Sequence, residues 1–226
     1  MVNTFLTDAD FKTSAKNLDT KRLGCQRKES YQILCLGEDL TYLGTMFGDP
    51  LPANPLQRRA WIRRIAAKYR TLPYRFVIRD LHSAGKIERL RIQVDLQIVD
   101  KFPKKKDFKH PLTIDGVTLY PTDRIVKLGY CYHPAVVMWL GYPEALKEYI
   151  NVHIQEWIQR NNKNTMKTYT VPDKIEYPPW TQDPSFHQNH KSALLYKEQN
   201  NKEPLWYVLK HDFVAAGKFV DYIWPY

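Results

Sequence analysis

Cysteine is scarce in this sequence, and it has no long apolar run. The three cysteines, Cys25, Cys35 and Cys131, are odd in number, and their spacings match neither a disulfide framework nor a zinc site. No stretch approaches the roughly 18 consecutive apolar residues that a membrane span needs, and residues 1–10 lack a cationic start followed by an apolar run. We therefore expect an intracellular protein without membrane contact, cytoplasmic or nuclear, or packaged in a virion if its source is a virus.

Acidic residues are missing from one long part of the chain. None occurs between Pro50 and Arg79. From Pro50 to Lys127 there are 18 Lys and Arg against 7 Asp and Glu, whereas the rest of the chain has 16 against 17, so the net charge of +10 resides in one third of the sequence. Such a concentrated surplus favours a polyanionic partner, and nucleic acid is the partner we expect, with an acidic protein as the alternative.

Capping residues and periodicity predict helices in the first third of the chain. Thr7 is expected to cap a helix ending at Lys16, and Asp19 a second helix over about 20–36. A loop over 44–55, rich in proline and glycine, should follow. Asn54 then precedes a helix that ends near Arg70, whose inward residues are expected to be Leu56, Ile62, Ile65, Ala66 and Tyr69.

The remainder predicts a small sheet and further helices. Alternating apolar residues over 90–98 are typical of a half-buried strand, and Asp115-Gly116 is typical of a tight hairpin turn. Helices should start at Pro134, Pro143 and Pro184. The fold class is therefore α-rich, α+β overall: a single domain over 1–226 whose mainly helical core carries a basic α+β insertion over 50–127.

One predicted helix carries an unusual stripe. Arg22, Gln26, Glu29 and Ile33 stand at offsets 0, 4, 7 and 11, which places them on one face of a helix with 3.6 residues per turn. A polar stripe that continues into an apolar residue suggests groups held against a cleft. Glu29 is its only acid and is a candidate for proton transfer; the alternative is a salt bridge to Arg22 or Lys28 on a solvated face.

Several motifs, in order, resemble the pyrimidine-dimer DNA glycosylase or endonuclease V-like family of bacterial and viral proteins. The resemblance covers about two thirds of the chain and lies in Thr4-Phe5, Leu18-Asp19, residues 21–29 (KRLGCQRKE), 32–34 (QIL), 133–139 (HPAVVMW), Gly141-Tyr142, Ala145-Leu146, Tyr149, Pro179-Trp180, 186–194 (FHQNHKSAL) and 222–225 (YIWP). Residues 50–127 depart from the pattern, because similar proteins pass through a much shorter connection.

The resemblance implies base-excision repair of damaged duplex DNA without a cofactor. A neutral amine would attack the sugar C1′, the base would leave, and the resulting Schiff base would permit strand cleavage by an AP-lyase step. An α-amino group, with a pKa near 8, is closer to the neutral state than a lysine is. Removal of Met1 would expose the amine of Val2, with Lys21, Lys28 and Lys191 as alternative nucleophiles. Glu29 would protonate the departing base or stabilise a cationic sugar.

Further candidates follow from the same motifs and from the basic segment. The catalytic set is Val2, Arg22, Gln26, Glu29 and His187, and the nucleic-acid-binding set is Arg27, Arg58, Arg59, Arg63, Arg64, Lys68, His133, His190 and Lys191. Arginines would hold phosphates by bidentate hydrogen bonds, and the basic face would bind DNA in a salt-dependent way. The plainer alternatives are a solvated surface for the arginines, buried hydrogen bonds for His187 and His190, and a helix cap for His133.

Two other functions fit less well. A non-catalytic protein that binds or packages nucleic acid would use the basic segment alone and leave the cleft idle. A metal-dependent nuclease is disfavoured because no cluster of acidic ligands is visible, and His187 and His190 lack further ligands at a zinc spacing, so no metal is expected.

Overall fold

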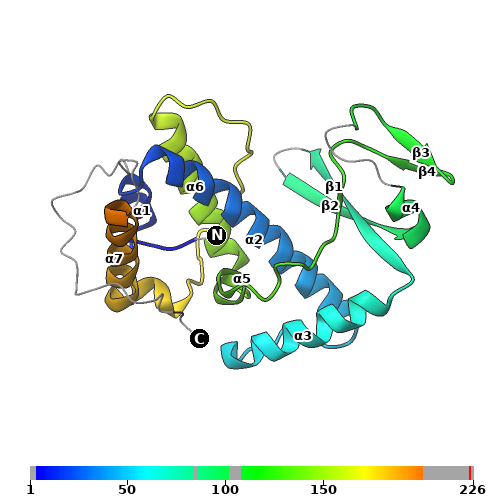
Figure 1. Ribbon diagram of the computed structural model, residues 1–226, viewed down its shortest axis with the longest axis horizontal. Coiled ribbons are helices and arrows are strands. Elements are labelled where there is room, and N and C mark those ends of the chain that lie inside the picture. Colours follow the sequence, from blue (N-terminus) through cyan, green and yellow to red (C-terminus); the bar gives the residue numbers. More distant parts are fainter. Residues whose placement is uncertain (1–3, 84–85, 102–107, 201–223, 225–226) are drawn as a thin grey trace.

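The computed structural model describes residues 4–83, 86–101, 108–200 and 224. The helices are α1 (Phe11–Lys16), α2 (Thr20–Met46), α3 (Pro55–Thr71), α4 (Leu96–Asp100), α5 (Pro134–Trp139), α6 (Pro143–Gln159), a 3-10 turn over Pro179–Gln182 and α7 (Pro184–Asn200). The strands are β1 (Tyr74–Ser83), β2 (Lys86–Asp95), β3 (Leu112–Ile114), β4 (Val117–Leu119) and β5 (Arg124–Ile125). The predicted α-rich α+β class is confirmed (Figure 1).

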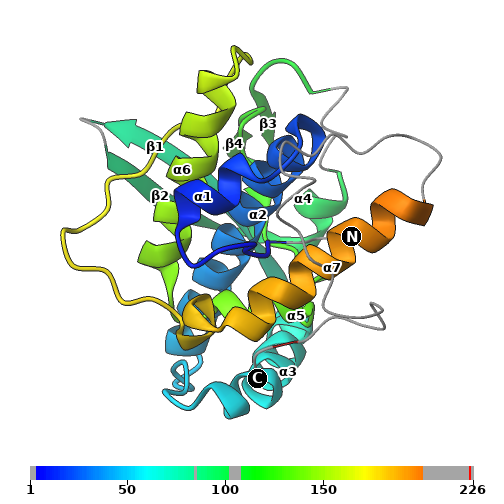
Figure 2. The same ribbon diagram turned by 90° about the vertical axis from the view of Figure 1, so that its left-hand side faces the viewer.

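The long helix α2 organises the helical part of the molecule. It packs along α6 and also contacts α3 and α5, while α1 packs against α6. Figure 2 shows α1 and α7 in front, at the end of the molecule away from the strands. The main hydrophobic core lies between these helices, and Trp61, Trp139 and Tyr149 are its largest buried side chains. None of the helices in the described ranges is long and apolar enough to cross a membrane.

The strands form two small antiparallel sheets at the other end of the molecule (Figure 1). The first has the order β2-β1-β5, and β1 pairs with β2 along its whole length; the second is the hairpin β3-β4. A separate cluster of buried apolar residues holds this part together: Val77, Val94, Ile98, Phe108 and Leu119. The strands therefore have their own small core, whereas α3 contributes to the main one.

Most helix starts follow the predicted local signals. The carboxylate of Asp19 caps α2 by accepting a hydrogen bond from the Arg22 backbone at 3.0 Å, and Asn54 caps α3 through the Leu56 backbone at 3.0 Å. The hairpin turn is also confirmed, because Asp115 and Gly116 both have positive φ, 48° and 79°.

The predicted cap of α1 is wrong. Asp10, not Thr7, caps this helix, and its carboxylate accepts hydrogen bonds from the backbone of Lys12 at 3.4 Å and of Thr13 at 2.9 Å. Thr7 is fully buried instead, and its hydroxyl accepts a hydrogen bond from the Asn17 side chain at 3.0 Å. The Thr7 hydroxyl is thus used inside the protein, and the exposed Asp10 is the residue that caps α1.

Helix α2 runs ten residues beyond the predicted end at Leu36. Gly44, which suggested a loop, lies inside the helix. An added Cβ there would stand 2.5 Å from the Trp61 ring and 2.8 Å from the Asp49 carbonyl, so only glycine fits at this position. This glycine permits close packing rather than a turn. The chain leaves the helix at Gly48, which has a φ of 65°.

Two further elements differ from the prediction. The strand expected over 90–98 is β2, which ends at Asp95, because the Asp95 carboxylate caps the short helix α4. Its partner β1 was not predicted, although its buried residues Phe76, Val77 and Ile78 form a continuous apolar run. A run without alternation does not distinguish a buried strand from a helix.

The inward face of α3 is the predicted one except near its start, because Ile62, Ile65, Ala66 and Tyr69 are buried as expected. Leu56, expected to face inward, is 74% exposed, whereas Arg58, expected on the exposed basic face, is 6% exposed. Trp61, which was not among the predicted inward residues, is fully buried.

Candidate active site

The N-terminal segment Thr4–Thr7 lies inside the helical body. All four residues are at most 1% exposed. The indole nitrogen of Trp139 in α5 donates hydrogen bonds to the Thr4 hydroxyl at 3.0 Å and to the Thr4 carbonyl at 3.3 Å. The Tyr149 hydroxyl in α6 lies 3.3 Å from the carbonyl of Phe5. The start of the described chain is thus anchored on two helices.

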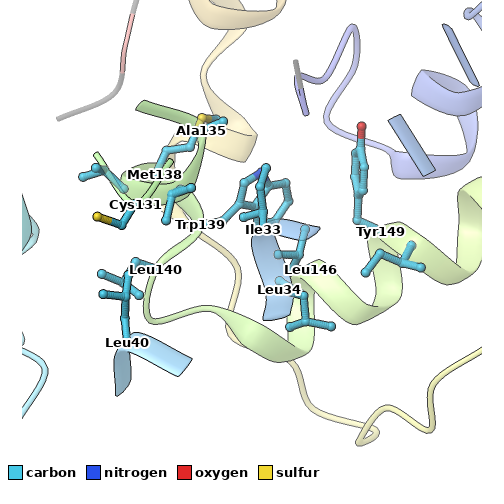
Figure 3. Close-up of a cluster of buried hydrophobic side chains, with 14 of the residues drawn as sticks. Ile33, Leu34, Leu40, Cys131, Ala135, Met138, Trp139, Leu140, Leu146 and Tyr149 are labelled. Atoms are coloured by element: carbon cyan, nitrogen blue, oxygen red, sulfur yellow. The ribbon is translucent and has the colours of Figure 1, made fainter. Parts of the chain in front are cut away.

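Tyr149 also connects this segment to the polar stripe of α2. Its hydroxyl donates a hydrogen bond to the side-chain carbonyl of Gln26, which is 3% exposed. Figure 3 shows the ring of Tyr149 near Leu146, with its hydroxyl pointing away from the apolar side chains of that cluster. Burial raises the pKa of Tyr149 well above its ordinary value, and the charge of Glu29 adds to this shift. Gln26, Glu29 and the N-terminal segment therefore share one neighbourhood.

The stripe on α2 has the predicted arrangement. Gln26 and Ile33 are buried, whereas Arg22 and Glu29 remain partly exposed. The guanidinium of Arg22 lies 2.8 Å from the carboxylate of Asp19, which is 3% exposed. Glu29 makes contacts of its own within the protein. The stripe thus presents one carboxylate and one anchored cation beside the buried N-terminal segment.

One predicted histidine contacts the same segment, and a second contacts Trp224, which itself packs on that segment. The ring of His190 in α7 lies 4.8 Å from that of Phe5, and Trp224 lies 5.1 Å from Phe5 and 6.0 Å from His133. His133 caps α5, because its Nδ1 accepts a hydrogen bond from the Ala135 backbone at 3.2 Å. Burial lowers the pKa of His133, so its neutral form is favoured.

The other candidates lie around this group. His187 is buried, and burial lowers its pKa. Lys191 is partly exposed, while Lys21 and Lys28 are exposed on α2. Within the part of the chain that the structure describes, no three His, Cys, Asp or Glu side chains converge as metal ligands do. Val2 lies outside the described residues.

Arg27 does not lie on an open surface. Its side chain is 5% exposed, its guanidinium lies 4.4 Å from the centre of the Trp157 ring, and it donates a hydrogen bond to Asn164. Burial lowers the pKa of Arg27. The expected bidentate contact with a phosphate would require this side chain to leave its place between α2 and α6.

The basic face of α3 is retained in part. Arg59, Arg63, Arg64 and Lys68 are exposed, and of these Arg64 forms an ion pair with Asp49 at 3.0 Å. The expectation that Arg58 belongs to this face is wrong. Its guanidinium donates a hydrogen bond to the Leu140 carbonyl and lies 5.2 Å from the Tyr142 ring, so it fastens α3 to the turn between α5 and α6.

Other arginines of the basic segment are also neutralised, so they do not gather on one exposed surface. Arg79 pairs with Asp123 at 2.8 Å. Arg89 pairs with Asp80 at 2.8 Å and with Glu38 of α2, and Arg124 pairs with Asp39 of α2 at 2.6 Å. The pairs of Arg89 with Glu38 and of Arg124 with Asp39 attach the sheet to α2. Among the described arginines of the basic segment, Arg59, Arg63 and Arg64 of α3 remain exposed.

The sequence did not reveal the hydrogen bonds that Trp139 and Tyr149 make. Each is an aromatic residue with a polar group, and such a residue usually finds a hydrogen-bond partner when it is buried. That rule signals a partner but does not identify it. The partners, Thr4, Phe5 and Gln26, are 123 to 144 residues away in the sequence.

The fully buried His153 predicts a pH-dependent stability. Its Nδ1 lies 2.7 Å from the Tyr149 carbonyl, its Nε2 has no hydrogen-bond partner in the described structure, and burial lowers its pKa from 6.5 to about 4. As the pH falls, His153 of the unfolded chain takes up a proton near pH 6.5, whereas the folded protein takes it up only near pH 4. The free energy of unfolding should therefore fall by about 3 kcal/mol for this residue between about pH 6.5 and pH 4.

We expect His153→Leu to remove this part of the acid sensitivity, measured by urea unfolding at pH 7, 5.5 and 4. The variant His110→Leu, which changes an exposed histidine, is the control and should retain the wild-type pH dependence. An equal pH dependence for wild type and His153→Leu would contradict the assignment.

Comparison with known proteins adds one finding. The model of a family described as pyrimidine dimer DNA glycosylase matches residues 2–170, about three quarters of the chain. No curated protein and no solved structure matches significantly. The matched range contains the N-terminal segment, the α2 stripe and Tyr149.

Proposed function

Because this chain belongs to the pyrimidine dimer DNA glycosylase family, we propose that it removes damaged bases from duplex DNA and then cleaves the strand as an AP lyase, with an amine as nucleophile and Glu29 as the acid. The observation that carries the proposal is the convergence of the buried segment Thr4–Thr7, Gln26 and the Glu29 carboxylate around Tyr149. Membership alone gives the reaction class; this arrangement supplies candidate groups for it.

The nucleophile we favour is the amine of Val2, after removal of Met1. Thr4 is held by Trp139, and two residues of extended chain span at most about 7 Å. The amine would therefore stay close to Thr4. Its nitrogen would form a bond to C1′ while the bond to the base breaks and the departing base takes a proton from Glu29. Loss of a proton from nitrogen and opening of the sugar ring would then give the Schiff base, from which β-elimination releases the 3′ phosphate.

The partly exposed groups around this segment suit a binding role. Arg22 is oriented by Asp19 and is 19% exposed, so it can turn toward a phosphate without leaving that partner. His190 packs against Phe5 of this segment, and we propose that His133, His187, His190 and Lys191 contact the displaced base or the backbone. Lys191, Lys21 and Lys28 remain the alternative nucleophiles.

We also propose that residues 50–127 are an addition to a shared helical core and that the exposed face of α3 binds the DNA backbone. Support comes from the separate apolar cluster of the strands and from the four exposed cations Arg59, Arg63, Arg64 and Lys68. A face of this kind binds phosphate without reading sequence.

Reversing the charge of these four α3 residues to Glu should reduce the salt dependence of DNA binding. Four lost phosphate contacts lower the slope of log K against log salt by about 3 to 4. Fluorescence anisotropy with a short duplex, between low and moderate salt, measures this slope. The control reverses four exposed lysines elsewhere, Lys12, Lys16, Lys163 and Lys167. An equal fall in both variants would mean that net charge alone, rather than the α3 face, determines binding.

The test of the proposed reaction uses ultraviolet-irradiated and abasic duplexes, with and without borohydride. We expect strand cleavage without borohydride and a trapped protein–DNA adduct with it, because borohydride reduces the Schiff base to a stable amine. Mass spectrometry of the adduct identifies the attacking residue. Neither product, together with tight salt-sensitive binding to undamaged DNA, would instead support the alternative function of non-catalytic binding or packaging, which the α3 face alone could perform.

A further inference from the structure

A pocket of about 890 Å³ lies alongside α2, and neither Gln26 nor Glu29 lines it. Its walls come from the second half of α2, from β2, from the turn between α5 and α6, and from residues 168–170. The strand β2 belongs to the basic segment, so this pocket exists only where that segment meets the helical core. Its volume is in the range of pockets that hold small organic ligands.

The floor of the pocket is apolar. Ile33, Trp139 and Leu146 contribute to it, and each of them is at most 4% exposed. Gly37 and Thr41 stand one turn apart on α2 and also line the pocket. Short side chains at both positions leave space over this part of α2. An apolar wall without bulky side chains can accommodate the face of an aromatic ring.

Most charges at the rim already have partners. Arg89 is engaged by Glu38 and Asp80, and Lys147 pairs with Glu144 at 2.7 Å. Since these groups are already paired, they leave little net charge at the rim to attract a charged ligand.

Arg91 differs from these residues. It has no ion pair within the described ranges, its Nε is buried without a hydrogen-bond partner, and its guanidinium lies 4.2 Å from the centre of the Tyr42 ring. The acid Glu88 also lines the pocket, and it is exposed to solvent, which screens its charge. The ring of Tyr42 holds the guanidinium in place, so a bidentate contact with an anion costs little additional side-chain conformational entropy.

We propose that this pocket binds an aromatic compound of mononucleotide size that carries one phosphate or carboxylate. The ring lies on the floor beside Gly37 and Thr41, and the anion is held by Arg91. This site is separate from the proposed reaction at Glu29 and does not require it. A free mononucleotide and an aromatic carboxylic acid share the required chemistry.

The test uses 1-anilinonaphthalene-8-sulfonate, a fluorescent aromatic anion, as the probe of the full-length protein. We expect one saturable site, an affinity at least about tenfold weaker in Arg91→Gln because a charged hydrogen bond is lost, and loss of binding in Thr41→Trp because the indole occupies the place proposed for the aromatic ring. Lys163→Gln, which removes an exposed cation outside the proposed sites, is the control and should bind as wild type does. Circular dichroism establishes that each variant is folded.

Displacement of the probe identifies the class of ligand. Displacement by deoxyadenosine monophosphate but not by deoxyadenosine would indicate a nucleotide, whereas displacement by 2-naphthoate alone would indicate a carboxylic acid; either result supports the proposal. Displacement by deoxyadenosine or 2-naphthol at the same concentration as their anionic counterparts would overturn it, because the anion would then be irrelevant. Unchanged probe affinity in both Arg91→Gln and Thr41→Trp would also overturn it, because the probe would then bind elsewhere.

Discussion

Replacing Glu29 with glutamine should reduce strand cleavage about 10²- to 10⁴-fold and leave DNA affinity nearly unchanged. The range is that of general acid catalysis by one positioned side chain. Glutamine has almost the same shape as glutamate but cannot supply the proton. The fold should tolerate the change, because Glu29 is only partly buried and the nearby hydrogen bond joins Tyr149 to Gln26 rather than to Glu29. The rate is measured on ultraviolet-irradiated duplex and the affinity by anisotropy on the same duplex.

Two substrates separate the two roles that Glu29 could have. An abasic duplex has no base left to protonate, so Glu29→Gln should cleave it at close to the wild-type rate if the carboxylate acts only on the departing base. A similar loss on both substrates would place the carboxylate at the sugar, where it would stabilise positive charge.

The control is Glu144→Gln, which changes a partly exposed acid of α6 that pairs with Lys147. This variant should retain wild-type cleavage. If Glu29→Gln also cleaved irradiated duplex at the wild-type rate, Glu29 would have no part in the reaction, and its contacts would be those of an ordinary surface salt bridge.

Local interactions made much of this fold predictable from sequence. Asp19, Asn54 and the Asp115-Gly116 turn act on backbone groups two or three residues away, so their partners are visible in the same short stretch of sequence. The α2 stripe was predictable for the same reason, because helical periodicity alone sets which side chains share a face. The choice between Thr7 and Asp10 as a cap was not, since burial of Thr7 decides it.

Partners that are distant in sequence were not predictable. Arg58, Arg89 and Arg124 belong to a segment with a strong positive surplus, which indicated a surface for DNA. Each instead has its partner 51 to 85 residues away: a carbonyl for Arg58, and α2 carboxylates for Arg89 and Arg124. The number of charged residues in a segment does not distinguish an arginine that can bind a phosphate from one that joins two elements of the fold.

The pair between Asp39 and Arg124 leads to the largest expected effect on stability. Asp39 is 2% exposed and accepts two hydrogen bonds from the Arg124 guanidinium, at 2.6 and 3.1 Å. Arg124 lies on β5, which pairs with β1, so this contact fastens the sheet to α2. Loss of the carboxylate charge would leave a mostly buried guanidinium without its counter-ion, and the Arg124 Nε already lacks a hydrogen-bond partner in the described structure.

Asp39→Asn should therefore lower the free energy of unfolding by about 2–4 kcal/mol, somewhat less than for a fully buried pair because the Arg124 side chain is 29% exposed. Urea unfolding measures the loss. The matched control is Asp115→Asn, because the Lys101–Asp115 pair is 3.4 Å long and its side chains are 58% and 63% exposed, so solvent screens it. Asparagine also suits the positive φ of that turn, and the control should change stability by less than about 0.5 kcal/mol. Equal, small losses in both variants would mean that the sheet is held to α2 by its apolar contacts, with the ion pairs adding little.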